Sequence, residues 1–189
     1  MDYPLSPDEV SEYTREKVIF SSYAESIYPS SHWDDLRIIY TKVHTAEKKV
    51  KSRAGMKTTV KTNPLYKHWV EYEETVLLKK VIEAVGNRDF STFADLTMKL
   101  CNGLHAMAMY TAPRISYLND VSQQIIDSVL MLNESETKAA YTFDAGPNAV
   151  IFTLKRYVHE IVSSLREIVG EENIFVTSPG KGAHYEVIE

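Results

Sequence analysis

The stretch Ala140–Leu154, AYTFDAGPNAVIFTL, decides the fold. It holds two short apolar runs, rich in β-branched and aromatic residues, on either side of a turn that contains Gly146 and Pro147. This pattern predicts a β-hairpin. Asp144 closes the first run, where a rigid turn would hold its carboxylate within reach of a substrate. A turn aspartate commonly bonds the backbone instead, so the pattern leaves a structural and a catalytic role open.

The segments around the hairpin alternate between strand and helix patterns. Before it, residues 36–43 (LRIIYTKV) predict a strand, and three amphipathic helices follow. After it, we expect a helix over 155–169, closed by Gly170, and short strands near 173–177 and 184–188. The three helices rest on apolar residues spaced by three and four: Leu65, Trp69, Tyr72 and Val76; Phe93, Leu96, Leu100 and Leu104; and Leu118, Val121, Ile125, Val129 and Leu132.

This order of elements predicts the fold class and the domain organisation. Strand, helices, two strands, helix and strand give an α+β domain with a ferredoxin-like split β-α-β sheet and extra helices in the first crossover. An additional helix is expected near the N-terminus, because Ser6, Pro7 and Glu9 form a capping box with proline at the first helical position. We therefore assign residues 1–22 to an N-terminal helix and 23–189 to one domain.

Composition narrows the class of protein. The chain has 189 residues, a formal net charge of -5 and one cysteine, Cys101, so no internal disulfide can form and a reducing compartment is the simplest expectation. No signal peptide or membrane-length apolar run occurs, and the acidic balance disfavours a nucleic-acid partner. The six histidines are scattered, which predicts no metal site. Both common phosphate-loop motifs are missing from the sequence.

One segment is strongly basic although the net charge of the whole chain is negative. Residues 48–61, KKVKSRAGMKTTVK, carry six lysines and arginines and no acidic residue. A solvated face is the ordinary explanation. Ser52, Gly55, Thr58 and Thr59 interrupt the charges, however, and would add hydroxyls and a flexible backbone for phosphate oxygens. We expect a loop here, and an anion-binding site is a fair alternative to a solvated face.

Several blocks of the sequence together resemble one family. AYTFDAGPNAV resembles the signature of the diphosphomevalonate decarboxylases, members of the GHMP kinase superfamily. SSHWDDLRIIY, AEKKVKSRAGM, DFSTFADLTMKLCNGLHA and ISYLND resemble further blocks of that family, in the same order. The resemblance covers the chain from about Tyr23 onward and implies the fold of a GHMP kinase C-terminal domain.

The resemblance also implies roles for individual residues. Asp144 would be the catalytic aspartate, beside the substrate's tertiary hydroxyl, and Ser52, Arg53 and Met56 would line the pocket for mevalonate diphosphate. Supporting positions are Asn102, His105, Ser116, Tyr117 and Asp120. For these five we favour a structural hydrogen bond or a helix cap over direct catalysis, because LND before a helix is an ordinary N-terminal signal.

The reaction implied is the decarboxylation of mevalonate diphosphate to isopentenyl diphosphate, driven by ATP with magnesium, in isoprenoid and sterol biosynthesis. The resemblance further implies a cytoplasmic homodimer. Family members are about twice as long, and their N-terminal half supplies the ATP loop, which has no counterpart here. Activity of this chain alone is therefore in doubt, and the alternative is a non-catalytic ligand-binding or interaction module derived from the same domain.

Overall fold

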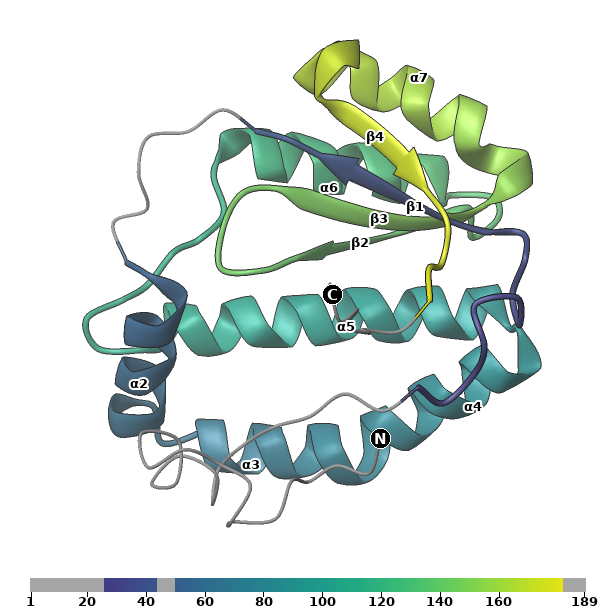
Figure 1. Ribbon diagram of the computed structural model, residues 1–189. Coiled ribbons are helices and arrows are strands. Elements are labelled where there is room, and N and C mark those ends of the chain that lie inside the picture. Colours follow the sequence, from purple (N-terminus) through teal and green to yellow (C-terminus); the bar gives the residue numbers. More distant parts are fainter. Residues whose placement is uncertain (1–25, 44–49, 182–189) are drawn as a thin grey trace, which may run out of the picture.

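The computed structural model describes residues 26–43 and 50–181 (Figure 1). The helix expected within residues 1–22 and the strand expected at 184–188 lie outside these ranges. Within them the chain forms an α+β domain, which confirms the predicted fold class.

A four-stranded antiparallel sheet forms the centre of the domain. Its strands are β1 (Leu36–Thr41), β2 (Ala139–Phe143), β3 (Ala149–Leu154) and β4 (Ile174–Thr177), in the order β2-β3-β1-β4. The hairpin pairs Tyr141 with Ile151, as the sequence predicts. Strand β1 ends two residues early, because the Val43 N–H leaves the ladder and donates to Asn148 Oδ1 at 2.9 Å.

The helices lie in the crossovers. Between β1 and β2 run α2 (Ser52–Thr62), α3 (Tyr66–Tyr72), the π-helical turn η2 (Glu73–Leu77), α4 (Leu78–Asn87), α5 (Phe90–Met109) and α6 (Asp120–Leu132). Between β3 and β4 run the 3₁₀ turn η3 (Lys155–Tyr157), α7 (Val158–Val169) and the 3₁₀ turn η4 (Glu171–Asn173). Asn119 caps α6 through a reciprocal capping box with Ser122.

The loop expected within residues 48–61 is wrong from Ser52 onward, because this part forms helix α2. The hydroxyls that suggested a loop are used inside the helix. Thr58 and Thr59 each donate to the carbonyl four residues before them, at 2.9 and 3.1 Å. Buried Gly55 is accommodated in the helix.

Helices cover both faces of the sheet. One core cluster joins Phe143 and Ile151 to α6 and α7, through side chains such as Ile125 and Leu165. The other joins Ala140 and Leu154 to α4 and α5. In Figure 1, α5 runs beneath the sheet, and α3 and α4 form an outer layer below it. The face predicted for the first of the three helices is partly wrong: Trp69 and Val76 are half-buried, whereas Leu65 and Tyr72 are exposed.

Candidate functional site

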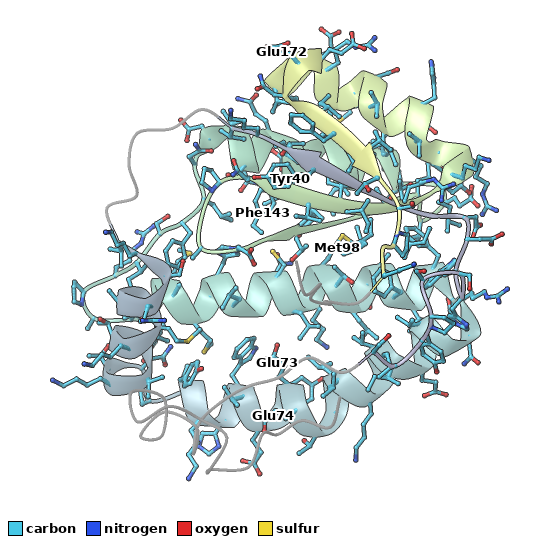
Figure 2. All side chains as sticks on the ribbon, viewed as in Figure 1. Tyr40, Glu73, Glu74, Met98, Phe143 and Glu172 are labelled. Atoms are coloured by element: carbon cyan, nitrogen blue, oxygen red, sulfur yellow. The ribbon has the colours of Figure 1, made fainter. Side chains whose placement is uncertain are left out.

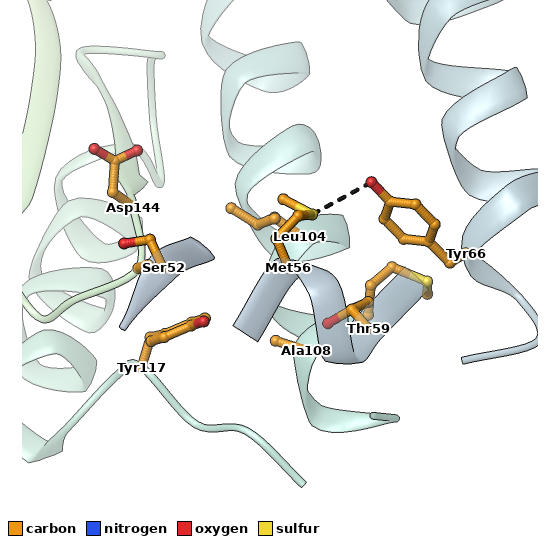
Figure 3. A pocket seen from close by; sticks show the side chains of 10 residues that line it. Ser52, Met56, Thr59, Tyr66, Leu104, Ala108, Tyr117 and Asp144 are labelled. Carbon is orange, nitrogen blue, oxygen red and sulfur yellow. Dashed lines mark hydrogen bonds between the residues drawn. The ribbon is translucent and has the colours of Figure 1, made fainter. Parts of the chain in front are cut away.

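A pocket of about 300 Å³ opens where α2, the C-terminal half of α5 and the turn after β2 meet (Figure 3). Figure 3 places Asp144 and Ser52 toward one end of it and Tyr66 toward the other, with Met56 between them. The lining residues are Ser52, Met56, Thr59, Tyr66, Leu104, Met107, Ala108, Tyr117, Asp144 and Ala145. The walls are thus largely apolar, with carboxylate and hydroxyl groups among them.

Asp144 comes directly after β2, in the tight turn of the hairpin. Its carbonyl accepts the Gly146 N–H at 2.8 Å, which holds the turn closed. In the described residues the Asp144 carboxylate makes no hydrogen bond to the turn, and the side chain is exposed. The turn is therefore held by backbone alone, and the carboxylate is available to a ligand.

The first turn of α2 faces the same pocket. Lys51 is the N-cap and provides no side-chain cap, and the turn holds no acidic residue. Backbone N–H groups at such a helix start carry a partial positive charge and suit an anion. Ser52 lies in this turn and lines the pocket, and Met56 lies one turn later. Arg53 is exposed and is not part of the lining, so the structure does not bring it into the pocket with its neighbour.

His105 lies behind the hairpin, on the buried face of α5. Its Nε2 is 3.2 Å from the Phe143 carbonyl oxygen, so this nitrogen carries the proton and donates. Burial lowers the pKa of His105, and this effect outweighs the Phe143 carbonyl and the Asp144 carboxylate, which both raise it. The imidazole is therefore neutral at physiological pH and braces the strand from which Asp144 emerges.

The remaining supporting residues take mostly structural positions. The Asn102 Oδ1 accepts the Tyr141 hydroxyl at 3.1 Å, which ties α5 to β2. Asp120 is the exposed first residue of α6, where the helix dipole favours a carboxylate. The exposed Ser116 hydroxyl donates to the Leu118 carbonyl. Tyr117 alone among these lines the pocket with Asp144, and burial raises its pKa.

Sequence reasoning missed the wall of the pocket opposite Asp144. Tyr66, from α3, donates its hydroxyl to the Met56 sulfur at 3.4 Å (Figure 3, dashed line). Leu104 and Ala108 lie four apart on α5, a spacing that also fits an ordinary core face. Such a spacing predicts a helix face. This face of α5 becomes the wall of a pocket only because α2 and α3 pack around it.

A second groove of about 430 Å³ adjoins the first, between the α3–η2 layer and α5. It shares Met56 and Asp144 with the pocket and adds Glu73 and Cys101. Burial, and then the neighbouring Glu74, raises the pKa of Glu73, and burial raises the pKa of the Cys101 thiol. Figure 2 shows Glu73 pointing from this outer layer toward α5. Asp144 therefore lies where the two cavities meet.

In residues 26–43 and 50–181, no group of three or more His, Cys, Asp and Glu side chains could hold a metal ion. Over the same ranges, each helix is too short or too polar to cross a bilayer.

Fold and site together define an α+β domain in which a helix start and a strand end face one small cavity. Comparison with known proteins then gives the family. A family model described as the mevalonate 5-diphosphate decarboxylase C-terminal domain matches residues 38–184. The chain belongs to this family, as the sequence blocks around Asp144 predict.

Individual relatives agree with this assignment. The chain is 40% identical over 164 residues to the diphosphomevalonate decarboxylase of Danio rerio, covering 84% of this chain and 41% of that protein. It is 44% identical over 147 residues to that of Rattus norvegicus, covering 77% and 37%. A solved structure of the Enterococcus faecalis mevalonate diphosphate decarboxylase, described as showing an ATP-binding mechanism mediated by mevalonate diphosphate, has a TM-score of 0.72. Its identity is 25%, and the match covers 86% of this chain and 48% of that one.

The chain thus spans about two fifths of the length of the curated relatives it matches, 41% and 37% in the two cases above.

Proposed function

We propose that this chain forms the substrate-binding part of a diphosphomevalonate decarboxylase, an enzyme that converts mevalonate diphosphate to isopentenyl diphosphate with consumption of ATP. One observation carries the proposal. Ser52, at the start of α2, and Asp144, at the end of β2, line the same pocket although they are distant in sequence. A substrate with a diphosphate at one end and a reacting hydroxyl near the other needs two such groups.

In this proposal, each end of the substrate has its own partner on the chain. The diphosphate lies against the first turn of α2, where Ser52 offers a hydroxyl and the helix offers free N–H groups. The tertiary hydroxyl lies beside Asp144, which orients it and accepts its proton. The apolar side chains of Leu104 and Met107 pack against the carbon chain between these ends. A volume of about 300 Å³ suits a ligand of this size.

ATP with magnesium is implied by the family. The described residues hold no group of three or more metal-ligating side chains, and the sequence carries neither common phosphate loop. We propose that ATP binds in the part of the relatives that lies outside the match.

Finer features of the family belong to the same proposal. We propose a cytoplasmic homodimer, as in the family it resembles, and a ferredoxin-like split β-α-β arrangement of the sheet. The strand order β2-β3-β1-β4 supports the latter, because each helical crossover, from β1 to β2 and from β3 to β4, then joins two parallel strands that are separated by one antiparallel strand. We also propose that the domain begins at residue 23.

The alternative is a ligand-binding or interaction module without catalysis. The pocket itself fits this alternative equally well, because ligand binding requires no phosphoryl transfer. The two functions share the pocket and differ in turnover.

Calorimetric titration with mevalonate diphosphate tests the site. We expect the chain to bind, and Ser52→Ala to weaken binding about tenfold through the loss of one hydrogen bond to a charged group, about 1.5 kcal/mol. Ser91→Ala, which removes an exposed hydroxyl at the start of α5, is the matched control and should leave binding unchanged. A chain that does not bind, or equal losses in the two variants, would refute the assigned pocket.

A further inference from the structure

Helix α2 approaches Tyr117 so closely that only glycine fits between them. A Cβ atom added to Gly55 would lie 2.0 Å from the Tyr117 hydroxyl oxygen and 3.3 Å from Cζ of the same ring. Gly55 is buried, so the contact lies on the inner side of the helix. Ser52 and Met56, on either side of it in sequence, line the pocket, as does Thr59 of the same helix.

The C-terminal half of α2 is fixed by hydrogen bonds to α5 and to the segment after it. The Thr59 and Thr111 hydroxyls are 2.9 Å apart, and Thr62 Oγ1 accepts the Ala112 N–H at 3.1 Å. Just after the helix, the Asn63 side-chain amide donates to the Met107 carbonyl at 2.9 Å. This half of the helix therefore cannot slide, and a displacement at Gly55 must tilt the first turn.

Tyr117 is equally constrained. Its ring lies edge-on to the His105 ring, with centroids 6.3 Å apart. Two residues before it, Ile115 is buried and its N–H donates to the Ala108 carbonyl at 3.1 Å. The ring therefore acts as a fixed stop beneath the first turns of α2.

We propose that Gly55 and Tyr117 form a positioning pair, which sets the separation between the first turn of α2 and Asp144 and thereby the length of ligand that the pocket accepts. Ser52 lies three residues before Gly55, about one turn, so a tilt about the fixed C-terminal half changes its distance from Asp144. The identity of the ligand rests on the proposed function, whereas the positioning rests on the packing alone.

A double-variant experiment separates positioning from general stability. Gly55→Ala should shift the backbone amide resonances of residues 52–56 and weaken mevalonate diphosphate binding about tenfold or more, since small displacements of binding groups are costly. In Gly55→Ala/Tyr117→Phe the hydroxyl is gone, and the nearest ring atom is Cζ at 3.3 Å. We expect this variant to recover the amide positions and the affinity seen in Tyr117→Phe alone.

The chain offers a matched control away from the pocket. A Cβ on Gly86, in α4, would lie 2.5 Å from the Tyr28 hydroxyl oxygen. Gly86→Ala and Gly86→Ala/Tyr28→Phe repeat the same helix-glycine and tyrosine chemistry. They should alter the melting temperature and leave the resonances of residues 52–56 and the binding unchanged.

Three outcomes would overturn the positioning pair: unmoved amides of residues 52–56 in Gly55→Ala, no recovery in the double variant, or an equal effect of Gly86→Ala on those amides. If Gly55→Ala does not fold, Tyr117→Ala replaces it, because removal of the stop should displace the same amides. Failure of the unaltered chain to bind mevalonate diphosphate would refute the proposed function, while the amide shifts still decide the positioning.

Discussion

Asp144 and Ser52 line the same cavity from different kinds of element. Asp144 directly follows a strand, and Ser52 is the first residue of a helix. A strand end is held by its ladder, and a helix start presents free N–H groups. The two residues therefore suit different ends of a ligand, and substitutions at each should affect different measurements.

The first prediction concerns this division at the residue scale. Asp144→Asn should leave binding of mevalonate diphosphate almost unchanged, whereas Arg53→Ala should weaken it by about 1 kcal/mol. The loss is modest because Arg53 is exposed, and solvent screens its charge. Calorimetry on both variants measures it, with Lys61→Ala at the far end of α2 as the charge control. Equal losses of binding free energy for Arg53→Ala and Lys61→Ala would show that only the net charge of the helix matters, and not the position of Arg53.

The second prediction concerns His105. Burial lowers its pKa in the folded state, so the unfolded chain binds a proton there at higher pH than the folded chain does. The contribution of His105 to stability is complete above the unfolded pKa of about 6.5 and is lost as the pH falls toward the folded value. Urea unfolding at several pH values should therefore show a weaker pH dependence below pH 6.5 in His105→Gln.

Other titratable groups change the free energy of unfolding in the opposite direction with pH. The free energies of unfolding of the unaltered chain and of His105→Gln are therefore compared as a difference at each pH. The pKa of Glu73 is raised in the folded state, and its contribution is lost as the pH rises through the folded value. Subtracting the His105→Gln curve from that of the unaltered chain removes such common terms. A flat difference curve between pH 5 and 7 would contradict the assignment.

At the scale of elements, the end of α4 carries a strained residue. Arg88 adopts a left-handed conformation, with φ 54°, and its N–H donates to the Val85 carbonyl at 3.1 Å. Side chains other than glycine and asparagine are disfavoured there. Arg88→Gly should therefore raise the free energy of unfolding by about 0.5–1 kcal/mol.

Chemical denaturation with a position control measures this third prediction. Lys79→Gly, in the regular part of α4, should lower the free energy of unfolding by about 1 kcal/mol. The changes in the free energy of unfolding should thus have opposite signs in the two variants. This distinguishes relief of the left-handed conformation at Arg88 from the general effect of placing glycine in a helix. If both variants are destabilised, the left-handed cap is not where α4 is strained.

Elements with local signals were the predictable ones. The hairpin around Asp144 follows from strand residues and turn residues that are adjacent in sequence, and α6 follows from an apolar period preceded by Asn119. Helix α2 was missed because Gly55 and four hydroxyl residues weaken a helix in isolation. Contacts distant in sequence, such as Thr59 with Thr111, stabilise it instead.

The candidate site divides in the same way. Ser52, Met56 and Asp144 were named from the sequence through a family resemblance, and the structure brings them to one pocket. Tyr66 and Leu104 were not, because their positions depend on how α3 and α5 pack around α2. The roles of these residues in binding and catalysis stay predictions.

The fourth prediction belongs to the whole molecule. The purified 189-residue chain should fold on its own, because two core clusters cover both faces of the sheet. It should not turn over ATP and mevalonate diphosphate by itself. Charge stabilisation of the transferred phosphoryl group supplies most of the rate, and we propose that the groups responsible lie in the part of the relatives outside the match.

Coupled measurement of ADP release, with a cooperative thermal transition as the folding check, decides this prediction. Adding the remaining part of a relative in trans should restore some activity if the two parts reassociate. Substrate-dependent turnover of about one per second by the chain alone, the low end for such enzymes, would reveal an ATP site within it.

The π-helical turn η2 has a consequence for how this chain can tolerate insertions and deletions. Trp69 of α3 and Ala84 of α4 both turn toward α5, Trp69 over Gly103, and a continuous α-helix would place the two out of phase by one residue. A wide turn absorbs one surplus residue. Deleting a single residue from 73–77 would therefore give a regular helix that keeps α3 and α4 in phase, whereas inserting one more residue would rotate α3 by about 100° relative to α4 and carry Tyr66 away from Met56. The segment should therefore tolerate the loss of one residue better than the gain of one.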